Sequence, residues 1–186
     1  KQRMIGLKEK ISYGFGDMAS SMFWKIFGMY MLNFYTDVFG LAPAAVGTMF
    51  LITRIWDSVN DPIFGIVADR TRSRWGKFRP WILFGAVPFS VLGVLTFLVP
   101  PATWTPAMRL LYAYVTYTSV MMVYSAVTVP YASLLGVISP DGRDRNALSS
   151  FRMFFAYAGS FVALALVEPL VRSYSELGGV HSEARG

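Results

Sequence analysis

"RIWDSVNDPIFG", residues 54–65, places charged side chains in the middle of a long apolar stretch. Its charged and amide side chains are Arg54, Asp57, Asn60 and Asp61. The residues on either side are apolar enough for the hydrocarbon core of a membrane, where each charge costs about 2.5–3.5 kcal/mol. Such a cluster needs partners inside the protein or a water-filled cavity, and it marks the segment as a candidate functional site.

The composition predicts an integral membrane protein. Of 186 residues, 54% are hydrophobic and only 15% are charged, whereas about a quarter of the residues in a soluble domain are charged. The net charge of +6 does not indicate nucleic-acid binding, because lysine and arginine cluster between the apolar stretches. The absence of cysteine excludes disulfides and thiol chemistry. The single histidine, His181, lies in a polar tail, where we expect it to be solvated.

The hydrophobic pattern predicts an all-α membrane protein with five transmembrane helices. They cover roughly residues 12–38, 44–68, 81–99, 109–138 and 147–171. The tail, residues 172–186, is polar and too short to cross the membrane again. The first apolar segment is too long for a cleavable signal peptide and lacks a small-residue cleavage pattern, so we expect it to remain as a helix.

Basic residues alternate between the two sides of the predicted bundle. The N-terminal leader and the connections at residues 69–81 and 139–145 are rich in lysine and arginine, and the other connections hold few. The positive-inside rule then places the N-terminus in the cytoplasm and the tail on the extracytoplasmic side. We expect a multi-pass protein of the inner (plasma) membrane.

The polar cluster lies on one side of its predicted helix. At about 100° per residue its four members fall within roughly a third of the circumference, and Pro62 frees carbonyl groups nearby. One reading is a structural ion pair with Arg54, which leaves the second carboxylate unexplained. Another is an intramembrane aspartyl hydrolase, which normally draws its two carboxylates from facing elements. A third is a site for a small hard cation. Two carboxylates, an amide oxygen and a hydroxyl suit this kind of site best, because such cations prefer several oxygen ligands.

Several motifs along the chain resemble one transporter family. They are YGFGD (13–17), FYTDVFGL (34–41), RIWDSVNDP (54–62), DRTRSRWGKFRPW (69–81) and ALSSFRMFFAYAG (147–159). Together they are similar to the glycoside–pentoside–hexuronide:cation symporter family, within the major facilitator superfamily. The resemblance implies a transporter and not an enzyme. It also implies twelve helices in two six-helix halves, of which this chain supplies the first five, with the C-terminal half as its missing partner.

The resemblance implies a site for a coupling cation, Na⁺ or H⁺, and no other cofactor. The matching positions on the second and fourth predicted helices are Asp57, Asn60, Asp61 and Ser125. Ser125 stands where the family has a threonine, so the hydroxyl ligand is retained.

The resemblance also implies a sugar site, but here the chain departs from the family pattern. The positions that align with sugar-binding acidic and tryptophan residues are Ser21, Thr128 and Ala132. The candidate substrate-binding residues are Asp17, Ser21, Trp24, Lys25, Tyr124, Thr128 and Arg152. Asp17 lies one turn before Ser21, and Arg152 is shifted by one position from the family's arginine. For Trp24, a packing role is the more common reading at such a position.

Lys25 is expected near the middle of the first helix, where its ammonium needs a partner. The candidate partners are Asp57 and Asp61 on the neighbouring helix. In one reading Lys25 is a permanent counter-ion of these carboxylates. In the other it competes with the coupling cation or releases a proton, which makes the protein H⁺-coupled or weakly Na⁺-dependent.

The basic connection at residues 69–81 also has two readings. It satisfies the positive-inside rule and attracts anionic lipid. In major facilitator proteins the equivalent loop additionally forms charge pairs that close the cytoplasmic side. The candidate gating residues are Asp69, Arg70, Asp141, Arg143 and Arg145.

The sequence and the resemblance together predict cation-coupled secondary transport of a sugar, glycoside, pentoside or hexuronide by alternating access. We expect this chain to be inactive alone. Its expected partners are membrane lipid, a small-molecule sugar and the C-terminal half, without nucleic acid. The alternative is a non-transporting sensor or lipid-binding subunit built on the same scaffold.

Overall fold

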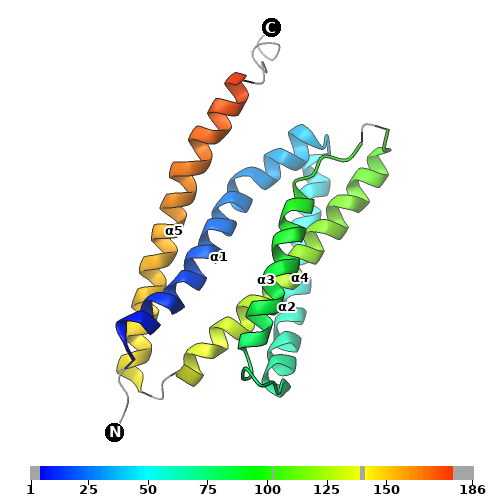
Figure 1. Ribbon diagram of the computed structural model, residues 1–186. Coiled ribbons are helices and arrows are strands. Elements are labelled where there is room, and N and C mark those ends of the chain that lie inside the picture. The colour runs from blue at the N-terminus through cyan, green and yellow to red at the C-terminus, as the bar shows by residue number, and fades with distance from the viewer. Residues whose placement is uncertain (1–4, 102, 139–140, 178–186) are drawn as a thin grey trace. The chain divides into compact units, whose positions relative to one another are not determined.

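The computed structural model describes residues 5–101, 103–138 and 141–177, which are helical apart from short connections (Figure 1). The elements are α1 (Leu7–Asn33), a π-helical turn η1 (Phe34–Val38), α2 (Pro43–Arg70), α3 (Arg79–Thr96), α4 (Pro106–Ile138) and α5 (Gly142–Leu177). The prediction of an all-α fold is therefore confirmed for the described residues.

The fifth helix begins before the apolar pattern does. Residues 142–145 were expected in a polar loop, which is wrong, because they form the first turn of α5. Asp141 precedes this turn, and its Oδ1 accepts a hydrogen bond of 2.9 Å from the backbone N–H of Arg143. Asp144 adds an acidic side chain to the first turn, and both features stabilise a helix N-terminus.

The other helix ends also differ from the hydrophobic pattern. α1 begins at Leu7, where the side chain of Glu9 accepts a 3.1 Å hydrogen bond from the backbone N–H of Gly6. α3 ends at Thr96, ahead of the expected residue 99. α5 continues to Leu177, so the expected tail begins inside a helix, and residues 178–186 lie outside the described part of the chain.

Three of the helices are long and apolar enough to cross a membrane by length and composition. They are α3, α4 and, up to Val171, α5. In α1 and α2 the apolar pattern is interrupted by charged residues such as Lys25 and Asp57, and each such charge strongly lowers the hydropathy of a segment. The three apolar helices are those of a multi-pass membrane protein, and α1 and α2 carry charged residues within their apolar pattern.

The described chain divides into two compact units. Unit 1 comprises Lys1–Tyr30 and Asp141–Gly186, and unit 2 comprises Met31–Pro140. Unit 1 therefore holds most of α1 together with α5. Unit 2 holds α2, α3 and α4.

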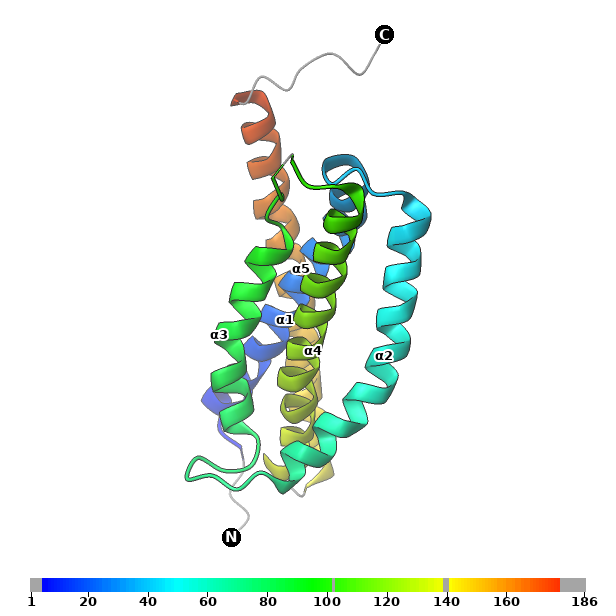
Figure 2. The ribbon, with the colours of Figure 1, turned by 90° about the vertical axis from the view of Figure 1, so that its right-hand side faces the viewer.

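In unit 2, α2 and α3 both pack against α4, which lies between them in Figure 2. α2 runs parallel to α4, since Phe50 is in ring contact with Tyr117 at 5.0 Å and Gly65 lies close to Val129. α3 runs antiparallel to α4, and the Tyr112 hydroxyl donates a 2.6 Å hydrogen bond to the carbonyl of Leu95.

The two sides of α2 differ in burial. The buried residues of this helix are Val46, Met49, Thr53, Asn60 and Ala68. A neighbouring side is apolar and exposed, with Val59 56%, Ile63 51% and Ile66 55% accessible. In a membrane an exposed apolar surface of this kind faces lipid or another apolar helix.

In unit 1, α1 and α5 run parallel and approach each other at glycines. A Cβ on Gly159 would lie 2.5 Å from the carbonyl oxygen of Met18, and a Cβ on Gly14 would overlap the ring of Phe155. Such small residues let the backbones of membrane helices come close together. Residues between these two contacts are thereby held in a defined register.

Candidate functional site

The polar cluster of α2 lies level with the predicted hydroxyl ligand of α4. Both helices rise by about 1.5 Å per residue, so their parallel contacts place residues 57–61 level with about residues 122–126. Asn60 is 5% exposed and Ser125 is 6% exposed. The structure thus brings the α2 cluster and Ser125 to the same depth within unit 2.

Two atoms of this cluster are enclosed without a hydrogen-bond partner among the described residues. They are Asp57 Oδ1 and Asn60 Nδ2. An enclosed polar atom without a partner is costly, and a carboxylate oxygen more so than a neutral one. A cation bound to Asp57 Oδ1 would supply the missing partner, and the amide oxygen of Asn60 is a further possible ligand.

The α2 cluster carries two carboxylates and one guanidinium, and thus one net negative charge. Asp61 repels the charge of Asp57 and Arg54 attracts it, while the buried Tyr117 of α4 lies near Arg54 and Asp57. Asp61 is exposed, so these residues enclose the cluster on one side only. Within the described residues no group of three or more His, Asp or Glu side chains is placed to hold a metal ion.

In unit 1, Arg152 of α5 forms a bidentate ion pair with Asp17 of α1. Arg152 Nε donates to Asp17 Oδ2, and Nη2 donates to Oδ1 at 3.2 Å. The side chains of Arg152 and Asp17 are 25% and 18% exposed, and the guanidinium carbon lies 5.6 Å from the centre of the Tyr13 ring. Two residues predicted for the substrate site are therefore in direct contact, in a geometry that makes strong hydrogen bonds.

A cavity of about 340 Å³ adjoins this pair. It is lined by Asp17, Ser149, Arg152, Met153 and Ala156. Its volume falls within the range of small-molecule sites, and its lining combines apolar groups with a few convergent polar ones, as such sites usually do.

The other predicted substrate residues of unit 1 lie along α1. Ser21 and Trp24 are half-buried, and the Trp24 ring makes an edge contact with Phe23 at 6.2 Å. Lys25 is exposed. Its pairing with the carboxylates of α2 stays a prediction, because those residues belong to unit 2.

Tyr124 and Thr128 lie on α4 in unit 2. The Thr128 hydroxyl donates a 2.8 Å hydrogen bond to the carbonyl of Tyr124, and the Tyr124 ring lies 5.8 Å from that of Phe89 on α3. These contacts show packing and local hydrogen bonding. A sugar-binding role for the two residues stays a prediction.

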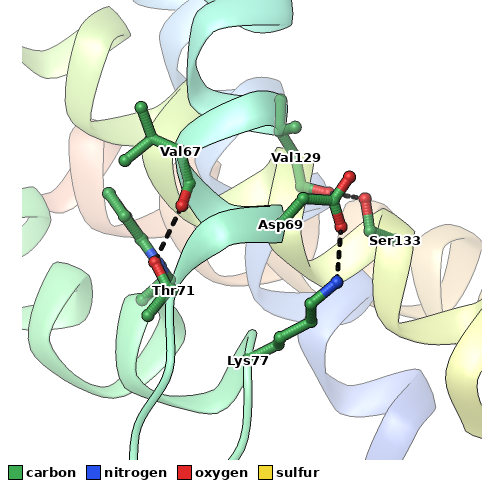
Figure 3. Close-up of polar contacts among 7 residues, drawn as sticks. Val67, Asp69, Thr71, Lys77, Val129 and Ser133 are labelled. Carbon is green, nitrogen blue, oxygen red and sulfur yellow. Dashed lines mark hydrogen bonds and ion pairs between the residues drawn. The ribbon is translucent and has the colours of Figure 1, made fainter.

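The predicted gating residue Asp69 is paired within its own connection. Lys77 Nζ lies 3.3 Å from Asp69 Oδ1, with 51% and 64% of these side chains exposed (Figure 3). Such exposed pairs contribute about 0–1 kcal/mol. The Thr71 hydroxyl also links this region, since it donates to the Val67 carbonyl at 2.8 Å and accepts a 3.0 Å hydrogen bond from Trp81 Nε1. The end of α2, the loop and the start of α3 therefore form one hydrogen-bonded corner.

The remaining gating candidates divide between the two units. Arg70 ends α2 in unit 2, whereas Asp141, Arg143 and Arg145 lie at the start of α5 in unit 1. The contacts of Asp141 include the helix cap described above and a 3.1 Å hydrogen bond from the backbone N–H of Arg145 to its carbonyl oxygen. A latch between the two basic regions stays a prediction.

Sequence reasoning missed four side chains at these places. Tyr13 and Ser149 accompany the Asp17–Arg152 pair, Tyr117 interacts with the α2 cluster, and Lys77 pairs with Asp69. Tyr13 stands in the quoted motif YGFGD, four residues before Asp17 and thus one helical turn away. That spacing was an available signal for this residue. For Tyr117, only the register of α2 against α4 reveals the contact.

Comparisons with known proteins give consistent results. A family model described as MFS/sugar transport protein matches residues 12–186. The "Inner membrane symporter YicJ" of Escherichia coli K12 is 46% identical over 171 residues, which is 92% of this chain and 37% of that protein. The "Isoprimeverose transporter" of Lactiplantibacillus pentosus is 39% identical over 185 residues, 100% of this chain and 38% of that protein. The "Glucuronide carrier protein homolog" of Escherichia coli K12 is 37% identical over 166 residues, 89% of this chain and 36% of that protein. The chain thus spans between 36% and 38% of the length of these relatives.

Proposed function

Because the chain belongs to the MFS/sugar transport protein family, we propose that the full-length protein containing it is a cation-coupled sugar symporter. The family consists of membrane transporters, so no enzymatic reaction is assigned to the chain. The names of its relatives include a symporter, an isoprimeverose transporter and a glucuronide carrier homolog. These names support a sugar or glycoside as the transported substrate.

One observation carries the coupling part of the proposal: Asp57 Oδ1 is enclosed and lacks a hydrogen-bond partner among the described residues. The coupling ion, Na⁺ or H⁺, binds at this carboxylate. Asn60 and Ser125 supply neutral oxygen ligands for Na⁺, and Asp61 supplies the second carboxylate. The bound ion offsets the repulsion between the two aspartates.

The sugar binds at the Asp17–Arg152 pair and its cavity. Both groups are held in a partly desolvated position, where hydrogen bonds to sugar hydroxyls are stronger than in water. Ser21, Trp24, Tyr124 and Thr128 are proposed to complete the sugar site. Lys25, also a candidate for the sugar site, is proposed to compete with the coupling cation for the α2 carboxylates.

Transport proceeds by alternating access around sites near the middle of the membrane. The N-terminus is proposed to be cytoplasmic, in the inner (plasma) membrane, because the basic connections alternate as the positive-inside rule requires. The hydrogen-bonded corner at Asp69 and Lys77 then lies on the cytoplasmic side. Together with Arg70, Asp141, Arg143 and Arg145 it contributes to closing that side.

Uptake into vesicles that carry the full-length protein tests this function. Glycosides, pentosides and uronides are supplied with an inward Na⁺ gradient, with an inward H⁺ gradient and with neither. We expect at least one sugar to accumulate faster when one of the gradients is present. Failure of every sugar to enter, with correctly inserted protein, would instead favour the non-transporting alternative.

A further inference from the structure

We propose that the cavity at the Asp17–Arg152 pair selects neutral sugars over sugar acids, because Asp17 already balances the charge of Arg152. The inference rests on the proposed transport function and names its substrate class. Neutral glycosides and pentosides are substrates, and hexuronides are not.

The charges that line the cavity balance each other. Its lining holds one carboxylate, one guanidinium, one hydroxyl and two apolar side chains, from Asp17, Arg152, Ser149, Met153 and Ala156. The carboxylate and guanidinium are joined by two hydrogen bonds, so the cavity presents a dipole and no net charge. A neutral ligand loses no charge–charge interaction on entering it.

The pair retains hydrogen-bonding capacity for sugar hydroxyls. A guanidinium has five N–H donors and a carboxylate about four acceptor positions, which is more than the two mutual hydrogen bonds and the interaction of Arg152 with Tyr13 use. A sugar hydroxyl both donates and accepts, and neighbouring hydroxyls can therefore contact Asp17 and Arg152 together. The Ser149 hydroxyl adds another donor and acceptor at the same cavity.

The same charge balance disfavours the binding of a sugar acid. Its carboxylate needs a cation, and the cation of this cavity already contacts Asp17 through both carboxylate oxygens. A second carboxylate at Arg152 would stand within a few ångströms of Asp17, in a partly buried site where like charges repel strongly. To bind a uronide, the protein has to separate the existing pair.

The surrounding packing opposes such a separation. The close contacts of Gly14 with Phe155 and of Gly159 with Met18 fix α1 against α5. Gly14 and Met18 lie on either side of Asp17 along α1, and Phe155 lies one turn after Arg152 along α5. Tyr13, which is 6% exposed, covers the guanidinium with its ring. The pair is therefore held in its paired geometry before the sugar arrives.

Lys25 is the other cation of α1 that could attract an acid. It does not line the cavity, and it lies about 12 Å farther along the helix than Asp17, at about 1.5 Å per residue. The positive charge that a uronide carboxylate needs is thus not supplied at the cavity itself.

Two series of three sugars test this selection, and the sugars within a series differ only in the substituent at C5. In the gluco series, methyl β-D-xyloside, methyl β-D-glucoside and methyl β-D-glucuronide carry hydrogen, hydroxymethyl and carboxylate at C5. Methyl α-L-arabinopyranoside, methyl β-D-galactoside and methyl β-D-galacturonide form the equivalent galacto series. Initial uptake rates are measured in vesicles with the full-length protein, and the uronide-to-neutral ratio is taken within each series. This ratio does not depend on how much protein each vesicle contains.

The expected wild-type ratio is about one tenth or less in the series that is transported, and a tenfold discrimination corresponds to about 1.4 kcal/mol. Asp17→Asn removes the carboxylate and should raise this ratio by about tenfold. Asp17→Glu keeps the charge and should leave the ratio low. Ser149→Lys adds a cation without removing the pair and should also raise the ratio, which provides a second test if Asp17→Asn fails to insert.

The outcomes separate this inference from the function on which it rests. A uronide taken up by the wild type as fast as its neutral partners would overturn the selection and leave the transport function intact. An unchanged low ratio in both Asp17→Asn and Ser149→Lys would also overturn it. Absence of uptake for all six sugars, with or without ion gradients, would overturn the proposed function together with the inference.

Discussion

A lysine in the first helix has consequences for coupling that can be measured directly. The sequence predicts Lys25 near the middle of the membrane, where an ammonium is costly and its stem is too far from either surface to reach water fully. In the proposed role, its ammonium competes with the coupling ion for Asp57 and Asp61. Lys25→Ala should then raise the apparent Na⁺ affinity of sugar uptake by roughly tenfold, equivalent to about 1.4 kcal/mol.

Uptake measured against Na⁺ concentration checks this effect, with Lys25→Arg as the charge-conserving control. The double variant Lys25→Ala with Asp57→Ala should reach the membrane in larger amounts than Asp57→Ala alone, because it leaves no unpaired lysine. An unchanged or weaker Na⁺ response in Lys25→Ala would mean that this lysine does not occupy the cation site.

The polar cluster of α2 could be predicted from the sequence, whereas Asp17 and Arg152 could be predicted only as separate residues and not as an ion pair. Asp57 and Asp61 stand out because a charge in an apolar helix has few acceptable surroundings. Asp17 and Arg152 lie on helices far apart in the chain. Their pairing depends on the register of α1 against α5, which packing at glycines fixes and which no local pattern encodes.

At the scale of the helices, the existence of each element was easier to predict than its ends. The apolar pattern predicted the order of the helices, but it could not place the start of α5. Capping by Asp141 extends that helix through polar residues, and polar residues carry no hydrophobic signal. Likewise, the η1 turn (Phe34–Val38) changes the hydrogen-bond pattern at the end of α1 without a change in hydrophobicity.

The glycine contact between α1 and α5 gives a prediction at this scale. In Gly159→Ala the new Cβ meets the backbone oxygen of Met18, so the two helices must move apart, at a cost of about 1–3 kcal/mol. The thermal unfolding midpoint of the full-length protein in detergent should fall, and sugar affinity should fall with it. Gly28→Ala is the matched control in α1, since nothing described lies within 4 Å of its Cβ position.

Equal unfolding midpoints for Gly159→Ala and Gly28→Ala would contradict the close packing of α1 on α5. A lower unfolding midpoint with unchanged sugar affinity would show that the helix contact stabilises the protein but does not determine how Asp17 and Arg152 bind the sugar.

At the scale of the molecule, the resemblance to the glycoside–pentoside–hexuronide:cation symporters is confirmed by the matched relatives, and the chain covers 37% of the length of one of them. The motifs behind this resemblance could be recognised in the sequence because they combine charges, glycines and aromatics at fixed spacings. The identity of the sugar could not be predicted, because the residues at the aligned sugar positions differ from the family pattern.

A chain of residues 1–186 alone should not transport sugar. Asp61 is exposed within it and the α2 cluster is enclosed on one side only, so a further set of helices is needed to complete a site with alternating access. Vesicles with this chain alone should show no sugar uptake above empty vesicles under an Na⁺ gradient. Robust uptake by a monomeric chain of this length would contradict the proposal, and cross-linking identifies any self-assembled form.

Replacing each carboxylate of the proposed cation site in the full-length protein tests most directly whether the coupling ion binds to α2. Asp57→Cys and Asp61→Cys remove one carboxylate each, and Ser58→Cys introduces the same side chain at an adjacent, exposed position of α2. Sugar uptake by vesicles is measured with and without an inward Na⁺ or H⁺ gradient. Both aspartate variants should lose the stimulation by the gradient, while Ser58→Cys retains it and equilibrium sugar binding persists in all three. Full stimulation in Asp57→Cys and Asp61→Cys would show that the coupling ion does not bind at the α2 cluster.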